Sequence, residues 1–279
     1  MLIVNNLSVF YKSDKIKKYL LNNVCFSLND GDSLGIIGKS GEGKSTLAKA
    51  LVGIYDKNIF KDEGEIIFDN NRFNNSFRGK KIALLFQNPN SYLNPLMKVG
   101  KQIDEMAIYH LHMKKKLAKE MALSLMKEVG IANAKEIYHY YPFELSGGLQ
   151  QRICLCIALI CNPKILVLDE CTSYLDNESK QEILNLIKRL QNKYHFSLIM
   201  ISHDFKEIYS MCDNIAIMNK GEIIEIDTKD EVILNPKNSY CKELLYDYWH
   251  YNSENCSLNS SSELDYEKIK ESIYENLRN

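Results

Sequence analysis

Apolar and polar positions alternate along residues 1–35 in two stretches, which is the pattern of antiparallel strands. The alternating apolar positions are Leu2, Val4, Leu7 and Val9 in the first stretch and Val24, Phe26 and Leu28 in the second. Successive side chains of a strand point to opposite faces, so each stretch gathers its apolar residues on one face. The lysine-rich segment between the two stretches, residues 12–18, is predicted to be a solvated loop.

Largely apolar runs follow at residues 33–37, 81–86, 164–168 and 196–202. Short runs without alternation are typical of strands buried on both faces of a parallel sheet. Further strands are predicted at residues 64–68, 214–218 and 221–225, and the last two are joined by a hairpin turn at Asn219 and Lys220. The chain is therefore predicted to be an α/β protein.

Helical periodicity separates these strands. Between about residues 98 and 141, apolar residues recur at steps of three and four, namely Ile103, Met106, Ala107, Leu117, Met121, Leu125 and Met126. We expect an all-helical insert over about residues 90–150, and its methionine-rich stripe is predicted to pack internally rather than to line a ligand groove. Other helices are predicted at residues 47–52, from about 147 to 160, and at 178–192.

Bulk composition limits the function classes. A chain of 279 residues can bury a sizeable core, and apolar and charged fractions of 45% and 25% are ordinary for a soluble globular protein. A net charge of −1 gives no electrostatic reason to expect a nucleic-acid partner. No stretch approaches the ~20 apolar residues of a membrane helix, and residues 1–5 do not resemble a signal peptide. We expect a cytosolic protein whose membrane role, if any, comes through a partner.

The eight cysteines show no CxxC motif and no metal-ligand spacing. They are Cys25, Cys154, Cys156, Cys161, Cys171, Cys212, Cys241 and Cys256. Several lie in apolar surroundings, where a free cysteine behaves as a small hydrophobe, and a reducing cytosolic compartment explains this usage. A redox or metal role is the alternative.

Residues 38–46 carry the pattern GxxxxGK[ST] between the predicted strand at 33–37 and the predicted helix at 47–52. In that setting, glycines turn consecutive backbone N–H groups toward one anion, and the helix N-terminus adds partial positive charge. Lys44 can reach the β- and γ-phosphates of a nucleotide, and the Ser45 hydroxyl can ligate Mg²⁺. We predict a nucleotide site; a flexible turn with an accidental Lys-Ser pair is the alternative. The predicted nucleotide-binding residues are Gly38, Lys39, Ser40, Gly41, Glu42, Gly43, Lys44, Ser45 and Thr46.

Two residues near this loop in sequence have open roles. Tyr11 ends the first strand and could stack on a purine ring, or it is simply a tyrosine at a strand edge. Gln87 follows the strand at 81–86 and precedes a loop containing Pro89 and Pro95. Its side-chain oxygen could serve Mg²⁺ or an attacking water, and a glutamine facing solvent is the alternative.

A second candidate for anion binding is the segment Ser146, Gly147 and Gly148, which opens an apolar helix. Backbone N–H groups at such a helix start can meet an anion. The same residues also fit an ordinary N-capped helix with a glycine hinge.

Acidic residues follow the buried strand at 164–168, where ligands bind in open α/β sheets. Asp169 is suited to hold Mg²⁺, directly or through water, and Glu170 to accept a proton from the water that attacks the γ-phosphate. His203 follows the strand at 196–202 and could hydrogen-bond a phosphoryl oxygen or the general base.

The end of the chain changes in character. Residues 251–262 are rich in serine and asparagine and are predicted to be a linker. Ser262 can cap a final helix with Tyr266, Ile269, Ile273 and Leu277 on one face. This helix either packs back on the body, which we favour, or binds a partner.

The order of these motifs resembles the ATP-binding cassette of ABC transporters over about residues 1–245. The resemblance rests on the phosphate loop, Gln87, the segment LSGGLQQR at 145–152, the segment LVLDE at 166–170, Asp176 and His203. It implies that Tyr11 stacks on adenine, that Gly38 to Thr46 are the Walker A loop, and that Gln87 lies on the Q-loop. It further implies that Ser146 to Gly148 form the signature, that Asp169 and Glu170 are the Walker B acid and general base, and that Asp176 and His203 are the D-loop and switch residues.

The resemblance implies a P-loop NTPase (RecA-like) core with an antiparallel β subdomain and the helical insert, using ATP and Mg²⁺. The domain would span residues 1–245, with residues 246–279 as a linker and short helix. The implied catalytic residues are Glu170, His203 and Gln87, and the implied metal ligands are Ser45, Gln87 and Asp169. Cys171 and Tyr174 depart from the family's usual proline and alanine, and Tyr174 lies where it could alter contact between subunits.

A finer match concerns direction and cargo. The segments QNPNSYLNP at 87–95 and YPFELSGG at 141–148 resemble those of oligopeptide, dipeptide and nickel importers, and NPKNSY at 235–240 resembles that group's tail motif. The short tail and the segment at 78–83 favour nickel or a metal chelate over peptides. The implied partners are two transmembrane permease subunits, a second identical or similar ATPase subunit and, indirectly, an extracellular solute-binding protein, with this chain peripheral at the cytoplasmic face of the cell membrane.

Other classes fit less well. A DNA-repair ABC ATPase needs long coiled-coil heptads, a translation-factor type carries two cassettes, and the signature sequence argues against a kinase or GTPase. An exporter subunit remains an alternative, because motor chemistry does not encode direction.

Overall fold

The computed structural model describes residues 1–14 and 16–253, which divide into two compact units. The first unit comprises residues 1–50, 55–72 and the described part of the chain from residue 200 onward. The second unit comprises residues 51–54 and 73–199.

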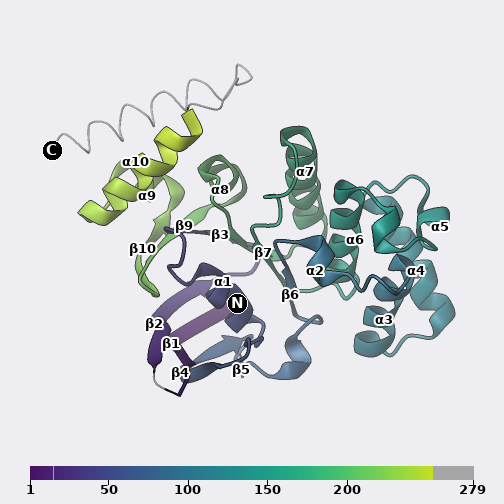
Figure 1. The fold of residues 1–279 in the computed structure, drawn as a ribbon, viewed down its shortest axis with the longest axis horizontal. Helices are drawn as coiled ribbons and strands as arrows, with labels where there is room; N and C mark the ends of the chain where they lie inside the picture. Colours follow the sequence, from purple (N-terminus) through teal and green to yellow (C-terminus); the bar gives the residue numbers. More distant parts are fainter. Residues whose placement is uncertain (15, 254–279) are drawn as a thin grey trace. The chain divides into compact units, whose positions relative to one another are not determined.

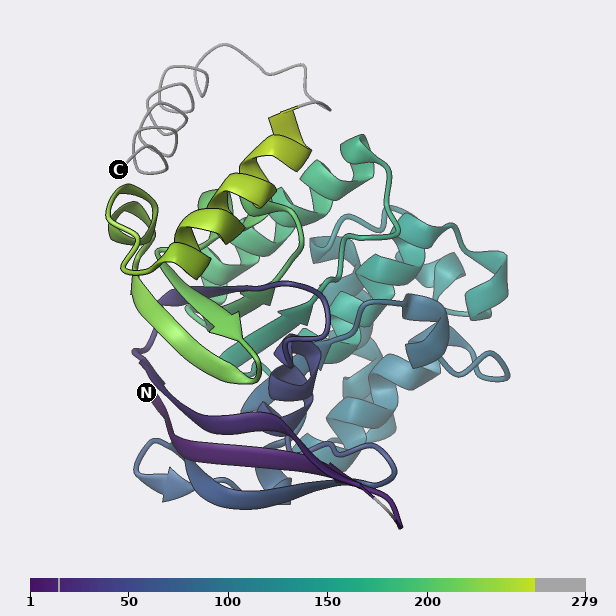
Figure 2. The same ribbon diagram turned by 60° about the vertical axis from the view of Figure 1, so that its left-hand side comes forward.

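The first unit contains an antiparallel sheet with strand order β2-β1-β4-β5 (Figure 2). Its strands are β1 (Leu2–Lys12), β2 (Lys17–Leu28), β4 (Ile59–Phe68) and β5 (Asn71–Arg72). The alternation in β1 changes parity between Val4 and Leu7, and the pairing with β2 shifts register at the same place. Asn6 takes a left-handed φ of 50° there, so the irregularity returns Leu7 to the buried face.

A second sheet in the first unit has the strand order β10-β9-β3. Its strands are β3 (Ser33–Ile37), β9 (Asn214–Asn219) and β10 (Glu222–Thr228). Strands β3 and β9 run parallel, from Leu34 opposite Asn214 to Ile37 opposite Ile217, and β9 and β10 form the predicted hairpin. All five residues of β3 are buried, as the largely apolar run predicts. The helices of this unit are α1 (Lys44–Leu51), α8 (Phe205–Met211), α9 (Lys229–Leu234) and α10 (Ser239–Ser253).

In the second unit, the parallel strands β6 (Ile82–Leu85) and β7 (Ile165–Asp169) pair in register from Ile82 opposite Ile165 to Leu85 opposite Leu168. Helix α7 (Asn177–Tyr194) follows β7, and β8 (Ser197–Ile201) leads out of the unit. Helix α6 (Gly147–Leu159) is buried along most of its length, which explains why its sequence is apolar on every side rather than amphipathic.

Helices α3, α4 and α6 pack against one another, with α5 against α4 and the short α2 against α6 (Figure 1). The bounds are α2 (Pro89–Tyr92), α3 (Val99–Leu111), α4 (Lys115–Glu128) and α5 (Ala134–Ile137), with 3₁₀ turns η1 (Asn75–Phe77) and η2 (Pro142–Glu144). Gly100 is required on α3, because a Cβ at this position would overlap the ring of Tyr138. The Tyr138 hydroxyl in turn donates to the buried carboxylate of Asp104.

Most of the predicted strands and helices are found, with several differences. Lys17 and Lys18 belong to β2 rather than to the loop, and β4 begins at Ile59, because both segments pair with β1. Helices α8, α9 and α10 and the short strand β5 have no counterpart among the predictions, and α10 crosses position 245. The segment after Gln87, predicted to be a loop, contains the single helical turn of α2. Residues 251–253 of the predicted linker are the last residues of α10, whereas the rest of that linker and the helix predicted from Ser262 lie outside the described residues.

Within residues 1–14 and 16–253, no helix combines the length and the apolar character needed to cross a membrane.

Candidate nucleotide site

The phosphate loop connects β3 to α1 in the first unit, which confirms the predicted order of strand, loop and helix. Gly43 has a left-handed φ of 97°, and a Cβ there would lie 2.5 Å from the carbonyl oxygen of Leu20. At Gly38, a Cβ would lie 2.6 Å from the carbonyl oxygen of Met218. Side chains are therefore excluded at both positions, by conformation at the first and by close packing at both.

Lys44 has the most constrained side chain of the loop, with only 5% of its surface exposed. Its Nζ donates to the carbonyl oxygens of Gly38, at 2.7 Å, and Lys39, at 2.9 Å. Little water screens an ammonium group held in this way, so it attracts an anion strongly. The loop thus has the charge and the shape for phosphate.

The loop is also tied to the turn between β9 and β10. The Glu42 carboxylate accepts from the backbone N–H of Lys220, and the N–H of Gly221 donates to the Glu42 carbonyl oxygen at 3.1 Å. Ser45 is exposed at the start of α1, and Thr46 follows it half-buried. An exposed hydroxyl at this point is a suitable oxygen ligand for Mg²⁺.

Two more predicted residues belong to the first unit. Tyr11 is half-buried on β1, where it pairs with Lys18 on β2 and Ile59 on β4. His203 is exposed directly after β8, in a turn fixed by its neighbours. The Ser202 hydroxyl donates to Glu207 at 2.6 Å and accepts from the N–H of Asp204 at 3.0 Å.

The second unit holds the predicted acids. Asp169 ends β7 with 5% of its surface exposed, and Glu170 follows it with a left-handed φ of 52°. The Gln87 amide nitrogen donates to a Glu170 carboxylate oxygen at 2.7 Å. This pairing directs the Glu170 carboxylate toward Gln87. Because the amide nitrogen makes this bond, the amide oxygen of Gln87 is not used in it. Amide and carboxylate oxygens are the ligands that Mg²⁺ prefers, so Gln87 and Asp169 both offer suitable groups.

The glycines of the predicted signature leave one side of a helix start open. The Ser146 hydroxyl caps α6 by accepting from the N–H of Leu149 at 3.4 Å. A Cβ at Gly147 or Gly148 would meet nothing within 4 Å. The buried Gln150 side chain fixes the segment before the helix, because it donates to the carbonyl oxygens of Pro142 at 3.0 Å and Leu145 at 3.2 Å.

Asp176 caps α7, a local role that the sequence did not indicate. Its carboxylate accepts from the backbone N–H of Ser179 at 2.9 Å and from the Ser179 hydroxyl at 2.8 Å. The backbone and side-chain hydrogen bonds from Ser179 lower the pKa of this carboxyl below its ordinary value. The loop between Glu170 and Asp176 also exposes the ring of Tyr174.

The predicted site residues therefore fall into two groups. The first unit contains Tyr11, Gly38 to Thr46 and His203, whereas the second contains Gln87, Ser146 to Gly148, Asp169, Glu170 and Asp176. Within each group the oxygen and N–H donor sets fit a magnesium nucleotide. The roles assigned to individual residues stay predictions.

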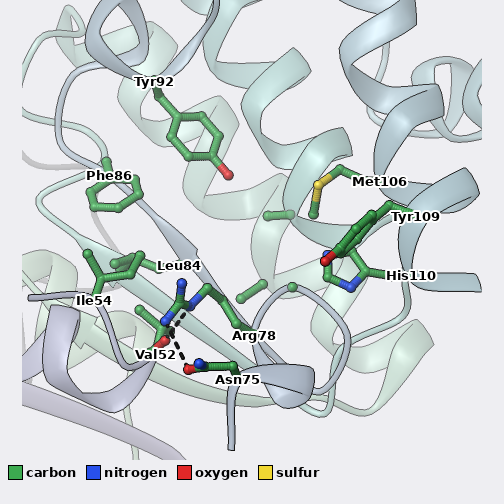
Figure 3. A pocket seen from close by; sticks show the side chains of 13 residues that line it. Val52, Ile54, Asn75, Arg78, Leu84, Phe86, Tyr92, Met106, Tyr109 and His110 are labelled. Carbon is green, nitrogen blue, oxygen red and sulfur yellow. Dashed lines mark hydrogen bonds between the residues drawn. The ribbon is translucent and has the colours of Figure 1, made fainter.

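The second unit also contains a cavity of about 380 Å³ beside the Gln87 segment, which the sequence did not predict (Figure 3). Its lining includes Phe86 and Tyr92, with Met106, Tyr109 and His110 on α3. Met106 thus faces this cavity, although its stripe was predicted to pack internally. Arg78 lines it as well and donates to the carbonyl oxygen of Val52 at 2.8 Å. Burial raises the pKa of Tyr92 to about 12, and burial followed by the charge of Lys80 lowers the pKa of His110. No single apolar pattern marks this lining, because it comes from several elements.

The sequence profile of the ABC transporter family matches residues 21–173. This chain belongs to the ABC transporter family. The match runs from β2 to the loop after β7, and so includes the phosphate loop, Gln87, the signature and both acids. The resemblance to the ATP-binding cassettes of this family is thereby confirmed.

Similar proteins in this family are named as ATP-binding proteins of oligopeptide transport. The oligopeptide transport ATP-binding protein AmiE of Streptococcus pneumoniae serotype 4 is 38% identical over 233 residues, which cover 81% of this chain and 66% of AmiE. The oligopeptide transport ATP-binding protein AppD of Bacillus subtilis is 35% identical over 254 residues, covering 88% of this chain and 77% of AppD. The chain thus spans just under two thirds of the length of AmiE.

A similar solved structure is the ATP-binding cassette MJ0796 in a dimeric post-hydrolysis state bound to ADP and Pi. It has a TM-score of 0.71 and 27% sequence identity, and the match covers 82% of this chain and 98% of MJ0796. The cassette fold predicted from the motifs is confirmed by this similarity.

Proposed function

We propose that this ABC family member is the ATP-hydrolysing subunit of an importer that takes up oligopeptides or dipeptides through partner permeases. The names of the relatives AmiE and AppD support the cargo class. The observation that carries the ATPase proposal is the buried Lys44 ammonium, held by carbonyl oxygens inside a glycine loop at a helix start. The earlier expectation of nickel or a metal chelate as cargo stays a prediction that these names do not favour.

Phosphate binding begins with the first unit. Backbone N–H groups of the loop and the Lys44 ammonium hold the β- and γ-phosphates of ATP, with Ser45 at the start of α1. Bound Mg²⁺ supplies charge neutralisation, with Ser45, Gln87 and Asp169 as the proposed ligands. His203 is fixed by the turn around Ser202 so that its exposed ring can hydrogen-bond a phosphoryl oxygen.

Hydrolysis then depends on positioning and on one proton acceptor. Glu170 accepts the proton of the attacking water, and the Gln87 amide fixes the direction of that carboxylate through its 2.7 Å hydrogen bond. The left-handed backbone of Glu170 directs its side chain away from the path of an ordinary strand end. Loop geometry and hydrogen bonding therefore determine together where the base lies.

A second copy, identical or similar, completes the site in this proposal. The backbone N–H groups at the start of α6, where no atom lies within 4 Å of a Cβ built at Gly147 or Gly148, would face the γ-phosphate held by Lys44 of the other copy. ATP would then hold two copies together head to tail, and hydrolysis would release them. The dimeric, ADP- and Pi-bound state of MJ0796 supports this arrangement by analogy.

The permeases are proposed to contact the cavity beside Gln87. Phe86 immediately precedes Gln87, and Tyr92 ends the short α2 that follows it, so a segment that fills the cavity would press on the chain that carries the Gln87–Glu170 pair. The cavity has apolar and aromatic walls and a few polar groups, as is typical of sites that bind a partner's side chains. This chain would thus lie at the cytoplasmic face of the membrane without entering it.

The proposal is tested with the tagged chain purified from membranes of cells that also produce the candidate permeases. We expect two membrane-spanning proteins to co-purify, and ATP-dependent peptide uptake to be lost in Lys44→Ala while the complex survives. The variant Tyr109→Ala removes an exposed ring at the cavity rim, so it should weaken the complex and leave the ATPase activity of the isolated chain intact.

The matched control is Leu117→Ala, an exposed apolar residue on α4 that does not line the cavity. It should change neither readout. Purification without any membrane protein would contradict the importer proposal, whereas equal effects of Tyr109→Ala and Leu117→Ala would contradict only the docking place.

A further inference from the structure

The side chain of Lys39 leaves the phosphate loop and contacts α10 in the first unit. Its Nζ lies 2.7 Å from a Glu243 carboxylate oxygen and 3.5 Å from an Asp247 carboxylate oxygen, both on α10. It also lies 5.8 Å from the ring centre of Tyr240. The hydrogen bond to Glu243 outweighs desolvation and raises the pKa of Lys39, so this ammonium stays charged.

Helix α10 is held firmly enough to serve as an anchor. The Asn238 side chain caps its start by accepting from the N–H of Cys241 at 3.0 Å. Cys241, Leu244 and Leu245 are buried, and the helix packs against α8. Tyr240, Glu243 and Asp247 are spaced three and four residues apart, so they share one face of the helix, which is the face that Lys39 meets.

The contact reaches the centre of the phosphate loop through the backbone of Lys39. The carbonyl oxygen of Lys39 accepts a hydrogen bond from the buried Lys44 ammonium at 2.9 Å, as that of Gly38 does at 2.7 Å. The carbonyl oxygen of Met218 also links the two elements, because the Tyr240 hydroxyl donates to it at 3.5 Å and it abuts Gly38. A displacement of α10 would therefore move atoms that position Lys44.

We propose that Glu243 and Asp247 are positioning residues for nucleotide binding, which act through Lys39 to hold the phosphate loop in its binding shape. This inference rests on the proposed function, because it assumes that the loop binds ATP. The carboxylates contact the Lys39 ammonium, whereas Lys44 contacts the Lys39 carbonyl oxygen, so the proposed role of the carboxylates is to anchor the loop rather than to contact the nucleotide.

The test is a cycle of variants with ATP dissociation constants measured by equilibrium dialysis. We expect Lys39→Gln and the double variant Glu243→Gln/Asp247→Asn each to weaken ATP binding about threefold, the size that exposed ion pairs allow. The triple variant should be no weaker than either, because all three changes cut the same contact. Lys39→Arg keeps the positive charge and should stay within about twofold of the wild type.

Simple charge effects predict a different pattern. If Lys39 attracted ATP directly and the carboxylates repelled it, Lys39→Gln would weaken binding and the double variant would strengthen it. Opposite signs, or additive losses in the triple variant, would overturn the proposal. In steady-state kinetics the loss should appear in KM for ATP, with kcat little changed.

Asp56→Asn is the matched control. Asp56 and Asp247 have the same side-chain exposure of 54%, but Asp56 pairs with Lys49 on α1 rather than with Lys39. This variant should bind ATP like the wild type. Lys44→Ala distinguishes failure of the proposed phosphate site from failure of the anchoring role. If Lys44→Ala binds ATP normally, the proposed phosphate site is wrong. If it loses ATP binding while the Lys39, Glu243 and Asp247 variants bind like the wild type, only the anchoring role is wrong.

Discussion

At the scale of single residues, the site depends on groups held in unusual states. Lys44 is an ammonium with 5% exposure, and Glu170 combines a left-handed backbone with a hydrogen bond from Gln87. Burial places the Lys44 ammonium where little water competes with it, whereas the hydrogen bond from Gln87 fixes the direction of the half-buried Glu170 carboxylate. Substitutions at these positions should therefore affect ATP chemistry more than stability.

Glu170, the proposed base, can be tested by a substitution that removes only its ability to accept a proton. Glu170→Gln keeps a side-chain oxygen that can accept from the Gln87 amide, so the geometry is preserved, but the amide cannot take up a proton. We expect kcat for ATP hydrolysis to fall by a factor of about 10² or more, with ATP binding retained. Glu178→Gln on α7 is the control and should leave kcat unchanged. Undiminished hydrolysis by Glu170→Gln would remove Glu170 from the mechanism.

At the scale of elements, the second unit is stabilised by contacts between helices as well as by its strands. Glu128 ends α4 and contacts α7 through Lys193, at 2.6 Å, and the hydroxyl of Tyr194, at 2.8 Å. Burial alone would raise the pKa of Glu128, but the hydrogen bonds from Lys193 and Tyr194 outweigh it and hold the pKa below its ordinary value. The charged carboxylate is thus the stabilising form.

This contact predicts a pH-dependent stability difference. Glu128→Gln should lower the free energy of unfolding by about 1 kcal/mol near pH 7, or the midpoint of thermal unfolding by about 2–4 °C. A lowered folded-state pKa means that the wild-type advantage is complete above the ordinary value of 4.5 and is lost as the pH falls through the lowered pKa. Thermal scans from pH 7 to pH 3 measure this change.

The control for this prediction is Glu120→Gln, an exposed carboxyl on the same helix. Its melting curve should follow the wild type at every pH. A Glu128→Gln deficit that persists undiminished at pH 3 would show that packing, not charge, explains the contact.

At the scale of the whole molecule, the predicted residues of the ATP site belong to two units of the chain. The signature residues Ser146 and Gly147, in the second unit, are exposed. The proposed dimer accounts for Gly147 and Gly148, since each opens a helix N-terminus to an anion that the same helix does not supply. It also gives the exposed ring of Tyr174, beside the proposed base, a surface to meet.

Dimerisation should therefore depend on ATP and on the signature. With ATP, Glu170→Gln should elute as a dimer in size exclusion with light scattering, and as a monomer with ADP. Adding Gly147→Asp should abolish the dimer, because its carboxylate repels the γ-phosphate. Aspartate suits the first turn of a helix, so α6 should remain folded, which circular dichroism can check. A dimer that persists in the Gly147→Asp background would contradict the shared site.

Much of this protein could be predicted from sequence because the signals are local. The phosphate loop, the acids after β7 and the apolar runs each lie within a few residues, and strand, loop and helix formation there is governed by neighbouring side chains. The change of parity between Val4 and Leu7 was not predicted, because the apolar residues of this stretch were assigned to one regular alternation. Helices α8 and α9 escaped prediction because they have only seven and six residues, too few for a clear period.

Contacts between distant segments were decided only by the tertiary structure. Gln87 and Glu170 are 83 residues apart, and Lys39 and Glu243 are 204 apart, yet both pairs meet within hydrogen-bonding distance. No residue pattern predicts such a pair, because the sequence around an exposed glutamine or lysine does not depend on whether its side chain contacts solvent or a carboxylate. The sequence determined which chemical groups stand at strand and helix ends, through local backbone geometry. Folding determined which of those groups touch, because that depends on how whole elements pack.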